Sequence, residues 1–489
     1  MTDLTVKLTL EQIQLKRLRL QSISPDDDKY NKESQRLVPY LSGEALWKEC
    51  ALVQKVLLET RAEFGQAGPE HVAEITYAFE KFDPLNAALL EELLKHDQLA
   101  VLEELGRYTG LETKARFHPG TTSYDLVDTA RAHLFKGAWK DVLRPKANEV
   151  IEGLCMTAEE NSGILQAGRT HLQRTSPVPL LSTLASYAAR LAERVGRCDD
   201  AFNNLRGKIS GIVGTGAGVD LVIGGGKSLE FERAVLAKLG LEPDLTATQI
   251  VQKERLADAG HQIVTLMCVL CDFTNDMRIL YSEDIGEVTS RDSAKRLGGS
   301  SADASKNNPI NWENATGKCI VVQSGMPILY AMIQSDLQRD LRGSVQARYQ
   351  PQAMMVQAYE SLCRVSKELG QLSVNQDRVA ANLESVRTFP SEAMVAVMRA
   401  HGWVHPQYGV GHDAVKEFSK IAKKEGRPLL DIAKEDKEFT EFYTTLPERE
   451  QEIMQGRLEL YLGSAIERAE HNLKYAREIA GRSSMEEIK

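Results

Sequence analysis

The sequence lacks the features that mark membrane, secreted and nucleic-acid-binding proteins. Its longest apolar run lies near residues 264–270, far short of the ~18 residues that a membrane span needs. The first residues do not form the basic-then-apolar pattern of a signal peptide. The net charge of −9 argues against a nucleic-acid surface as the main function. We therefore expect a cytoplasmic protein with no membrane and no nucleic acid among its partners.

Cysteine and proline are also scarce. The seven cysteines are scattered and odd in number, and the C-x-x-C formed by Cys268 and Cys271 lies in an apolar run without a second pair. We therefore expect core cysteines in a reduced protein rather than a metal site. Only 16 prolines occur, and alternating runs of β-branched residues are few, so the sequence offers little evidence for β-strands.

Apolar residues at helical spacing are abundant instead. Leu46, Val53 and Leu57 lie on one face of a first long helix. Similar patterns predict helices over residues 180–205, 257–281, 320–337, 352–372 and 450–480. Long helices that pack few aromatic residues favour a bundle of antiparallel helices. The sequence therefore predicts an all-α fold with a long central helical bundle.

The length of 489 residues suits about three domains. We predict an N-terminal helical domain over residues 1–123, in which residues 1–22 form a separate helix that extends the domain. A central helical bundle over 124–374 follows, and then a C-terminal helical domain over 375–489, where VNQDRVAANL begins a new element.

Residues 298–309 read GGSSADASKNNP. This segment cannot be the interior of a helix, because glycine, serine and asparagine favour turns and loops. A loop serine beside Lys306 could transfer protons, since a nearby positive charge stabilises an alkoxide. On composition alone, a solvated linker is the alternative. A second glycine-rich stretch, residues 211–226, lacks the strand–glycine–helix unit of a dinucleotide site.

Three of the ten histidines lie at breaks between helices, beside small polar residues: His96, His118 and His171. Histidine is the side chain that most easily transfers protons near neutral pH. Each of the three alone is more often structural, but functional sites gather at helix ends in a bundle.

Two arginines and a serine form a further candidate, in the segment RDLRGSVQAR. Arg339 and Arg348, with Ser344 between them, could clamp a phosphate group. The alternative is an exposed, charged start of a helix.

Together these segments resemble the fumarase/aspartase superfamily. The loop over 298–309 resembles its signature Ser-Ser-x-Met-Pro-x-Lys-x-Asn, and AGRTHLQ resembles its Gly-x-Thr-His segment. FHPGTTSYDLVDTA is similar to a segment of adenylosuccinate lyases and of carboxymuconate cycloisomerases. Matches to the adenylosuccinate lyase family in particular are His96-Asp97, Thr248-Gln249, KISGIVGT, PINWENATG, SPDDDKY and the Arg–Ser–Arg spacing. The resemblance covers roughly residues 24–400, in the same order.

The resemblance implies an all-α, fumarase/aspartase-like, three-domain protomer in a homotetramer whose active sites are shared between protomers. The implied reaction is β-elimination, which cleaves a succinyl carbon–nitrogen bond and releases fumarate. In purine nucleotide biosynthesis, adenylosuccinate would give AMP, and the succinyl-aminoimidazole carboxamide ribotide would give its amine. The substrate would be a small-molecule nucleotide, and neither a metal nor an organic cofactor is implied.

The resemblance also implies roles for single residues. Ser300 would remove a proton from the carbon beside a carboxylate, with Lys306 stabilising its charge, and His171 would protonate the leaving nitrogen. His96 and His118 would orient the carboxylates or the phosphate. The other implied substrate-binding residues are Lys29, Tyr30, Thr122, Ser123, Asp125, Thr170, Gln249, Ser301, Asn308, Arg339, Ser344 and Arg348.

The chain departs from the family pattern at two places. Asp303 and Ala304 replace the Met-Pro of the signature, so the loop should be looser and should carry a negative charge where a dicarboxylate would bind. Lys29 replaces an arginine, which keeps the charge but loses the bidentate fork. These changes leave two alternatives open: a fumarate-releasing lyase with another N-succinyl or dicarboxylate substrate, or a non-catalytic relative that binds nucleotides.

Overall fold

The computed structural model describes residues 9–24, 26–291, 306–384 and 390–482. Helices dominate it, which confirms the predicted all-α class. Those of the first half are α1 (Leu10–Leu20), α2 (Asn31–Ser34), η1 (Gln35–Leu37), α3 (Val38–Leu41), α4 (Gly43–Glu63), α5 (Pro69–Lys81), α6 (Pro84–Leu94), α7 (Asp97–Gly106), α8 (Leu111–Lys114), α9 (Ser123–Ala138), the π-helical turn η2 (Trp139–Leu143), α10 (Arg144–Glu160), α11 (Leu180–Asn203), α12 (Ala217–Ile223) and α13 (Ser228–Lys238).

The second half continues in the same way. Its helices are α14 (Glu254–Leu280), α15 (Ile310–Gln323), α16 (Met326–Ala331), α17 (Arg342–Leu369), α18 (Gln376–Glu384), α19 (Ser391–Ala400), α20 (Gly411–Glu425), α21 (Leu429–Lys434), α22 (Lys437–Thr445), α23 (Glu448–Met454), η4 (Leu458–Leu460) and α24 (Ala465–Gly481).

Strands are short and pair two by two in the described residues. Three pairs are antiparallel: β1 (Leu165–Thr170) with β2 (Gln173–Pro179), β5 (Val288–Ser290) with β6 (Leu372–Val374), and β7 (Val404–His405) with β8 (Gly409–Val410). The parallel pair is β3 (Arg206–Gly207) with β4 (Glu242–Pro243).

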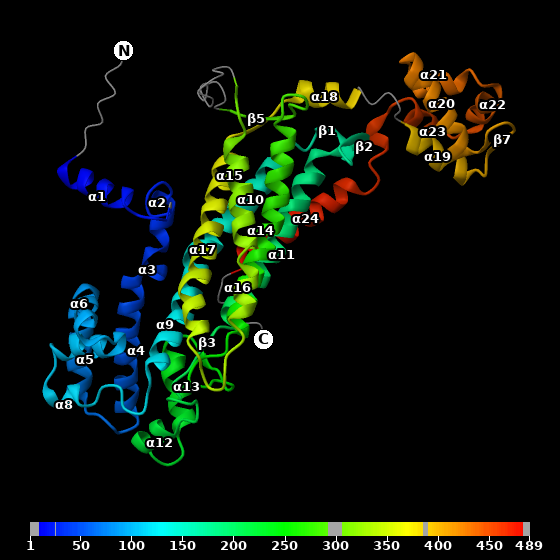
Figure 1. Cartoon of the computed structure of the whole chain (residues 1–489). Coiled ribbons are helices and arrows are strands. Elements are labelled where there is room, and N and C mark those ends of the chain that lie inside the picture. Colours follow the sequence, from blue (N-terminus) through cyan, green and yellow to red (C-terminus); the bar gives the residue numbers. More distant parts are fainter. Residues whose placement is uncertain (1–8, 25, 292–305, 385–389, 483–489) are drawn as a thin grey trace.

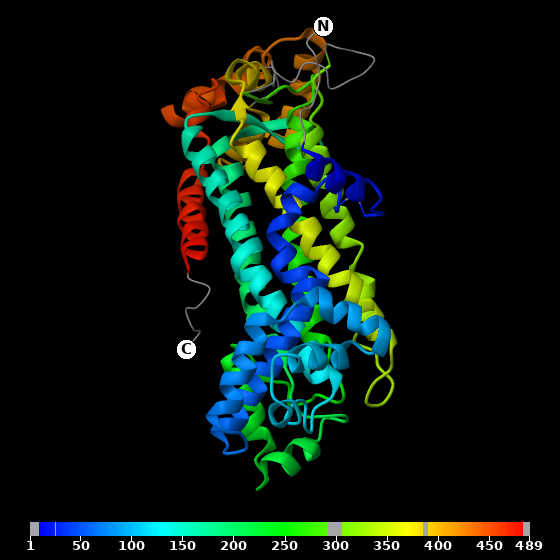
Figure 2. The same cartoon turned by 90° about the vertical axis from the view of Figure 1, so that its left-hand side faces the viewer.

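The molecule is elongated. Long helices, among them α10, α11, α14, α15 and α17, form a central bundle, and α4–α8 flank one end of it (Figure 1). Helices α19–α23 form a lobe beyond the other end, and the view turned by 90° shows the lobe at that same end (Figure 2). No helix in the described part of the chain is long and apolar enough to cross a membrane.

The long helices form where apolar side chains recur on one face. In α4, Val53 and Leu57 are buried as predicted, and the Ser42 hydroxyl accepts a hydrogen bond from the backbone amide of Ala45 at 3.0 Å, which caps the helix. In α11, Leu184, Leu191 and Val195 line the buried face. Burial of such a face supplies most of a helix's stability, so helix positions follow the apolar pattern.

Two hydrophobic cores hold the described residues together. One runs from α4 through the bundle and includes α24, which packs against α10 and α11: Arg144 at the start of α10 donates a hydrogen bond to the carbonyl of Arg482 at 2.7 Å. The second core lies within the lobe, around Met394, Phe418 and Phe439. The proposed domain boundaries, after residues 123 and 374, stay a prediction.

Three local predictions are wrong. The helix predicted over 320–337 is broken between α15 and α16, where Ser324 and Gly325 precede a proline, and proline cannot donate its backbone nitrogen to a helix. The helix predicted over 450–480 is interrupted between α23 and α24, where Gly456 and Gly463 have positive φ. Cys268, predicted to lie in the core, is exposed on α14.

Candidate active site

Those predicted site residues that the structure describes fall into three groups within one chain. The first lies at the end of the bundle flanked by α4–α8 and includes His96, His118 and Arg339. The second is the β1–β2 hairpin, which carries His171, and the third surrounds α2 and the beginning of α15 (Figure 1). The second and third groups are at the opposite end of the bundle from the first.

His96 caps a helix and faces α9. Its Nδ1 atom accepts a hydrogen bond from the backbone amide of Leu99 at 3.3 Å, at the beginning of α7. Its Nε2 atom lies 3.5 Å from the Ser123 hydroxyl. Because Nδ1 is an acceptor, the neutral ring carries its proton on Nε2. His96 and Ser123 therefore form a polar pair that can donate hydrogen bonds.

His118 is half-buried and has an unusual backbone. Its φ of +57° lies in the left-handed region, which costs free energy for a residue other than glycine and is frequent at functional sites. The Gln54 side-chain amide donates a hydrogen bond to its Nδ1 at 2.8 Å. Burial lowers the pKa of His118, with the nearby His96 also lowering it and Asp125 opposing the shift. A neutral ring with the proton on Nε2 follows.

Asp125 is fully buried, and its carboxylate is occupied by the protein itself. It pairs with the buried ammonium of Lys208, and it accepts hydrogen bonds from the backbone amides of Thr122 at 2.6 Å, Ser210 at 3.0 Å and Gly211 at 3.2 Å. These contacts fix the start of α9, where Thr122 and Ser123 lie half-exposed, and the role of Asp125 in substrate binding stays a prediction.

Gln249 and Arg339 meet next to α9. An Arg339 guanidinium nitrogen donates a hydrogen bond to the Gln249 side-chain oxygen at 2.9 Å, and the guanidinium lies 3.7 Å from the ring centre of Tyr124. A cation over an aromatic face is held in place electrostatically. Arg339 therefore has a fixed position near the beginning of α9.

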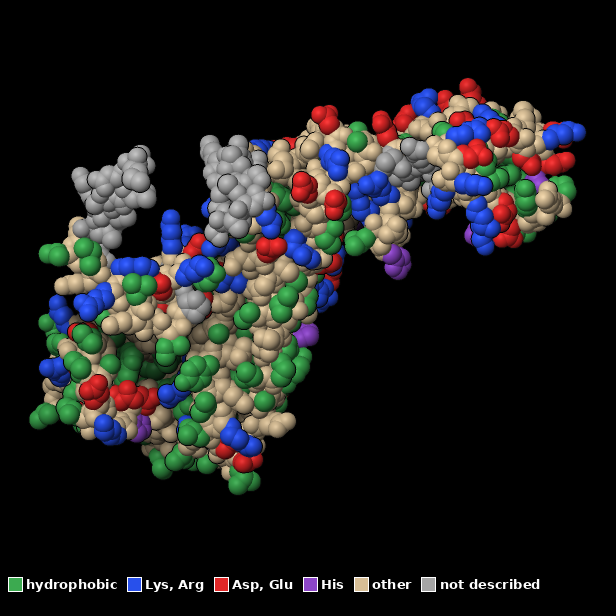
Figure 3. Space-filling model, turned by 45° about the horizontal axis from the view of Figure 1, so that its top comes forward, with side chains coloured by type: hydrophobic (Ala, Val, Ile, Leu, Met, Phe, Trp, Pro, Cys, Tyr) green, Lys and Arg blue, Asp and Glu red, His purple; other side chains and the backbone are tan. Residues whose placement is uncertain are grey.

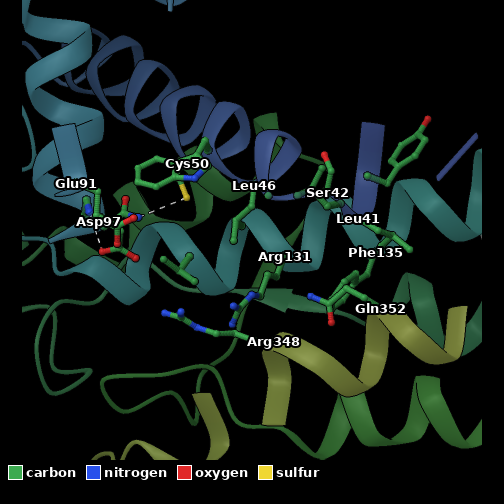
Figure 4. A pocket seen from close by; sticks show the side chains of 16 residues that line it. Leu41, Ser42, Leu46, Cys50, Glu91, Asp97, Arg131, Phe135, Arg348 and Gln352 are labelled. Atoms are coloured by element: carbon green, nitrogen blue, oxygen red, sulfur yellow. Dashed lines mark hydrogen bonds between the residues drawn. The ribbon is translucent and has the colours of Figure 1, made fainter. Parts of the chain in front are cut away.

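Ser344 and Arg348 lie in the first two turns of α17, as the helix-start alternative expected, and Arg339 precedes that helix. Ser344 is buried, whereas Arg348 is exposed and lines a cavity of about 250 Å³. The wall of this cavity also includes Asp97, next to His96, and Arg131 of α9 (Figure 4). The three predicted clamp residues therefore do not share one solvent-facing surface.

His171 is at the tip of the β1–β2 hairpin, at the other end of the bundle. Thr170 pairs with Gln173, and both residues of the turn, His171 and Leu172, have positive φ (53° and 60°). Hairpins with two-residue loops need this twist and usually use glycine or asparagine. His171, Leu172 and Thr170 are exposed, so the strained turn presents the imidazole to the outside.

A buried ion pair holds the base of the β1–β2 hairpin in place. Arg169 of β1 contacts Glu287, whose side chain is 1% exposed, and Asn382 of α18 donates to the same carboxylate at 2.9 Å. Glu287 directly precedes β5, the strand that leads toward residues 292–305. The base of the His171 hairpin is therefore tied to the strand that precedes the predicted signature loop in the sequence.

Ser300 and Ser301, with Asp303 and Ala304, lie outside the described residues. Lys306 and Asn308 are described: Lys306 is exposed and Asn308 half-buried, just before α15. Nearby, Asn311 of α15 donates a hydrogen bond to Glu368 at 2.7 Å.

Tyr30 packs against α15 and α17, whereas Lys29 is exposed. The Lys318 ammonium lies 3.8 Å from the ring centre of Tyr30, and Asn314 donates a hydrogen bond to its hydroxyl at 3.2 Å. This cluster lies far along α17 from Arg348, because Arg364 of the same helix lies 5.7 Å from the Tyr30 ring centre. Within one chain, the predicted nucleotide turn and the predicted phosphate clamp are thus apart.

Sequence reasoning missed several residues of these groups. Gln54, Tyr124 and Arg131 lie inside helices that read as ordinary amphipathic segments, and nothing in their spacing marks them. In the described part of the chain, no cluster of three or more His, Cys, Asp or Glu residues has the arrangement of a metal site.

Comparisons with known proteins give a consistent result. A family model described as "Lyase" matches residues 39–324. The chain is 26% identical to an adenylosuccinate lyase of Archaeoglobus fulgidus and 28% identical to one of Pyrococcus horikoshii; each alignment covers 94% of this chain and 99% of the relative. An adenylosuccinate lyase of Synechocystis is 32% identical over 55% of this chain and 60% of its own length.

Solved structures share the fold. A fumarate lyase from Mesorhizobium has a TM-score of 0.76 at 21% identity, over 92% of this chain and 98% of that one. A 3-carboxy-cis,cis-muconate lactonizing enzyme from Pseudomonas putida has a TM-score of 0.77 at 19% identity, over 91% and 98%. These likenesses support the fumarase/aspartase-like architecture.

Proposed function

The chain belongs to the lyase family whose model matches residues 39–324, and on that premise we propose that it cleaves adenylosuccinate to AMP and fumarate. The same chemistry would convert the succinyl-aminoimidazole carboxamide ribotide to its amine. The observation that carries the proposal is the near-complete alignment with adenylosuccinate lyases, which spans 94% of this chain and 99% of two relatives. The ordered motifs of the sequence support it.

The reaction removes a proton from carbon and breaks a carbon–nitrogen bond. In our proposal Ser300 takes the proton, the electrons form the double bond of fumarate, and the bonding pair leaves with the nitrogen, which His171 protonates. A free serine is a weak base, so Lys306 must stabilise the developing charge. His171 suits the acid role because its exposed, strained turn presents the ring outward.

The first group would bind the substrate. His96 and His118 each have Nδ1 occupied as an acceptor, so their Nε2–H groups can donate hydrogen bonds to succinyl carboxylates. Arg339, held by Gln249 and Tyr124, supplies a fixed positive charge. Asp125 acts indirectly, by fixing Thr122 and Ser123 at the start of α9. Ser301 and Asn308 would add hydrogen bonds from the loop.

We also propose that the active site is shared between protomers. The acid on the hairpin and the binding groups beside α9 lie at opposite ends of one bundle (Figure 1), so a single chain cannot bring them to one substrate. This separation supports shared sites, and the homotetramer that the family resemblance implies would supply them.

The surface of the bundle supports this assembly. Ile320 and Val321 of α15, Tyr330 of α16, and Val345 and Tyr349 of α17 are all more than half exposed, and an interface between protomers would cover such apolar side chains. Hydrophobic side chains are frequent over the body of the molecule, whereas charged side chains dot the projecting lobe (Figure 3).

The test of the function is a direct assay. Purified protein is mixed with adenylosuccinate, and the ultraviolet absorbance is followed as AMP forms. Turnover that Ser300→Ala abolishes supports the proposal. A correctly assembled protein that leaves adenylosuccinate unchanged refutes it.

Sharing of the site is tested by mixing two inactive variants. Ser300→Ala and His171→Gln chains are unfolded together and refolded, so that mixed tetramers form. If each site draws these two residues from different chains, some sites in the mixture contain neither substitution and activity returns. Activity that stays at the level of the separate variants refutes the shared site.

Asp303 and Ala304 favour one second candidate, a fumarate-releasing lyase with a different N-succinyl or dicarboxylate substrate, because the added carboxylate alters the loop that would cover the succinyl group. A fumarate-release screen over adenylosuccinate, argininosuccinate and aspartate distinguishes the two. A preference for adenylosuccinate excludes the second candidate.

A further inference from the structure

Arg131 of α9 is a buried cation whose Nε and Nη1 atoms have no partner among the described residues. Arg131 is only 7% exposed. Its Nε and Nη1 atoms form no hydrogen bond within the described part of the chain. Burying a guanidinium without partners is unfavourable, and buried polar groups are nearly always hydrogen-bonded. An unsatisfied buried arginine therefore points to a ligand.

The neighbouring buried cations show the contrast. Lys208 pairs with Asp125, Lys253 pairs with Asp128 at 2.8 Å, and Arg144 pairs with Asp199 at 2.9 Å. Each of these contacts satisfies a charge inside the fold. Buried Arg61 also has an unpaired Nε atom, but its Nη1 atom donates a hydrogen bond to the carbonyl of Arg116. In the described part of the chain, two nitrogens of Arg131 have neither an acidic partner nor a carbonyl acceptor.

Arg131 faces a cavity that also contains Arg348. The cavity, of about 250 Å³, lies between α4, α9 and α17, and the side chains of both arginines line it (Figure 4). Clefts that hold a drug-sized ligand measure roughly 300–1,000 Å³. This smaller cavity has room for one end of a nucleotide rather than the whole.

The charged side chains in the wall of the cavity indicate which end of a nucleotide would bind there. The two guanidiniums come from α9 and α17, whereas the carboxylates of Glu91 and Asp97 come from α6 and α7. Guanidinium forks match phosphate oxygens, and carboxylates accept hydrogen bonds from ribose hydroxyls. A ribose 5′-phosphate satisfies both sides, whereas a plain dicarboxylate leaves Glu91 and Asp97 facing like charges.

The cavity also adjoins the candidate site. Asp97 directly follows His96, whose Nε2 atom lies 3.5 Å from the Ser123 hydroxyl. We propose that Arg131 binds the 5′-phosphate of the substrate together with Arg348. This inference rests on the proposed function and adds a binding residue that lies outside the Arg339–Ser344–Arg348 motif.

The first experiment separates phosphate binding from catalysis. Arg131→Met should raise the KM for adenylosuccinate about 10- to 100-fold with little change in kcat, which is the loss expected for hydrogen bonds to a charged group. Succinyladenosine, which has no phosphate, should be cleaved equally well by both proteins. Lys136→Met removes a cation from the same helix outside the cavity and should behave as the wild type.

The second experiment needs no turnover. Inorganic phosphate should raise the Tm of the wild type and of Lys136→Met, but not that of Arg131→Met. Without phosphate, Arg131→Met should be at least as stable as the wild type, because an apolar side chain replaces an unpaired buried charge. Arg131→Lys, which retains the charge, should recover part of the phosphate response, and it serves as the test if the methionine variant does not fold.

The outcomes distinguish the two proposals. Normal turnover together with an unchanged KM and an unchanged phosphate response in Arg131→Met overturns the role of Arg131 and leaves the proposed function intact. An Arg131-dependent phosphate response in a protein that does not cleave adenylosuccinate supports the anion site and refutes the proposed function.

Discussion

The buried pair of Asp125 and Lys208 gives the sharpest test of how the site is held in place. Both side chains are 0% exposed, and the two carboxylate oxygens together accept hydrogen bonds from Lys208 and from three backbone amides. In Asp125→Asn one oxygen becomes an NH₂ group, which must face a donor, and the Lys208 charge remains buried without a counter-ion.

The expected cost follows from these contacts. Removing one partner of a buried ion pair typically costs about 3–5 kcal/mol, and every 1.4 kcal/mol changes an equilibrium about tenfold. The amides of Ser210 and Gly211 should therefore exchange with deuterium roughly 10²- to 4 × 10³-fold faster in Asp125→Asn, because exchange reports local opening. As a control, Asp272→Asn removes the acid of an exposed pair with Arg190 and should cost at most about 1 kcal/mol.

The single variant Lys208→Met and the double variant Asp125→Asn/Lys208→Met complete the cycle. Since the double variant removes the stranded charge, it should lose less protection than Asp125→Asn alone. The reasoning is refuted if Ser210 and Gly211 exchange at the wild-type rate in Asp125→Asn, or if the two single effects add to within about 0.5 kcal/mol, the result expected for independent sites.

Three further predictions concern the chemistry. Ser300→Ala should lower kcat about 10²- to 10⁴-fold, as for the loss of a general base, while sedimentation shows unchanged assembly; full activity would rule out Ser300 as the base. Arg339→Met should raise the KM for adenylosuccinate about 10-fold or more, and an unchanged KM would remove it from the substrate site. Burial lowers the pKa of His118, so the folded state binds fewer protons than the unfolded state. The contribution of His118 to the free energy of unfolding is therefore complete above the ordinary histidine pKa of about 6.5. It is lost as the pH falls through the lowered pKa. The Tm of His118→Gln should therefore fall less than that of the wild type between about pH 8 and pH 5.5, and equal falls would contradict this account.

The helices could be predicted because each buries its own apolar stripe. The pattern of Val53 and Leu57 defines α4, and the pattern of Leu184 and Leu191 defines α11. The β1–β2 hairpin was not predicted, since its turn uses histidine and leucine with positive φ instead of the glycine or asparagine that marks such turns. Here the tertiary structure overrides the local preference.

The sequence could predict which residues belong to the candidate site, but not which of them contact one another. Asp125 matched a binding motif, but Lys208, 83 positions away, occupies its carboxylate, and no local spacing reveals such a partner. Arg131 was missed because an arginine within a helix is expected to be a solvated charge, and the sequence does not show that this one is buried. Contacts between distant segments decided both residues.

The last helix of the described residues has a consequence for biosynthesis. Helix α24 covers α11, yet the two are separated by about 260 residues of sequence. At a synthesis rate of roughly 5–20 residues per second, the apolar face of α11 remains uncovered by α24 for on the order of 13–52 s, until the ribosome has made that helix. A chaperone that recognises apolar helices would find its substrate in that interval. A chain that stops after the lobe would retain this exposed face permanently and would be prone to aggregation.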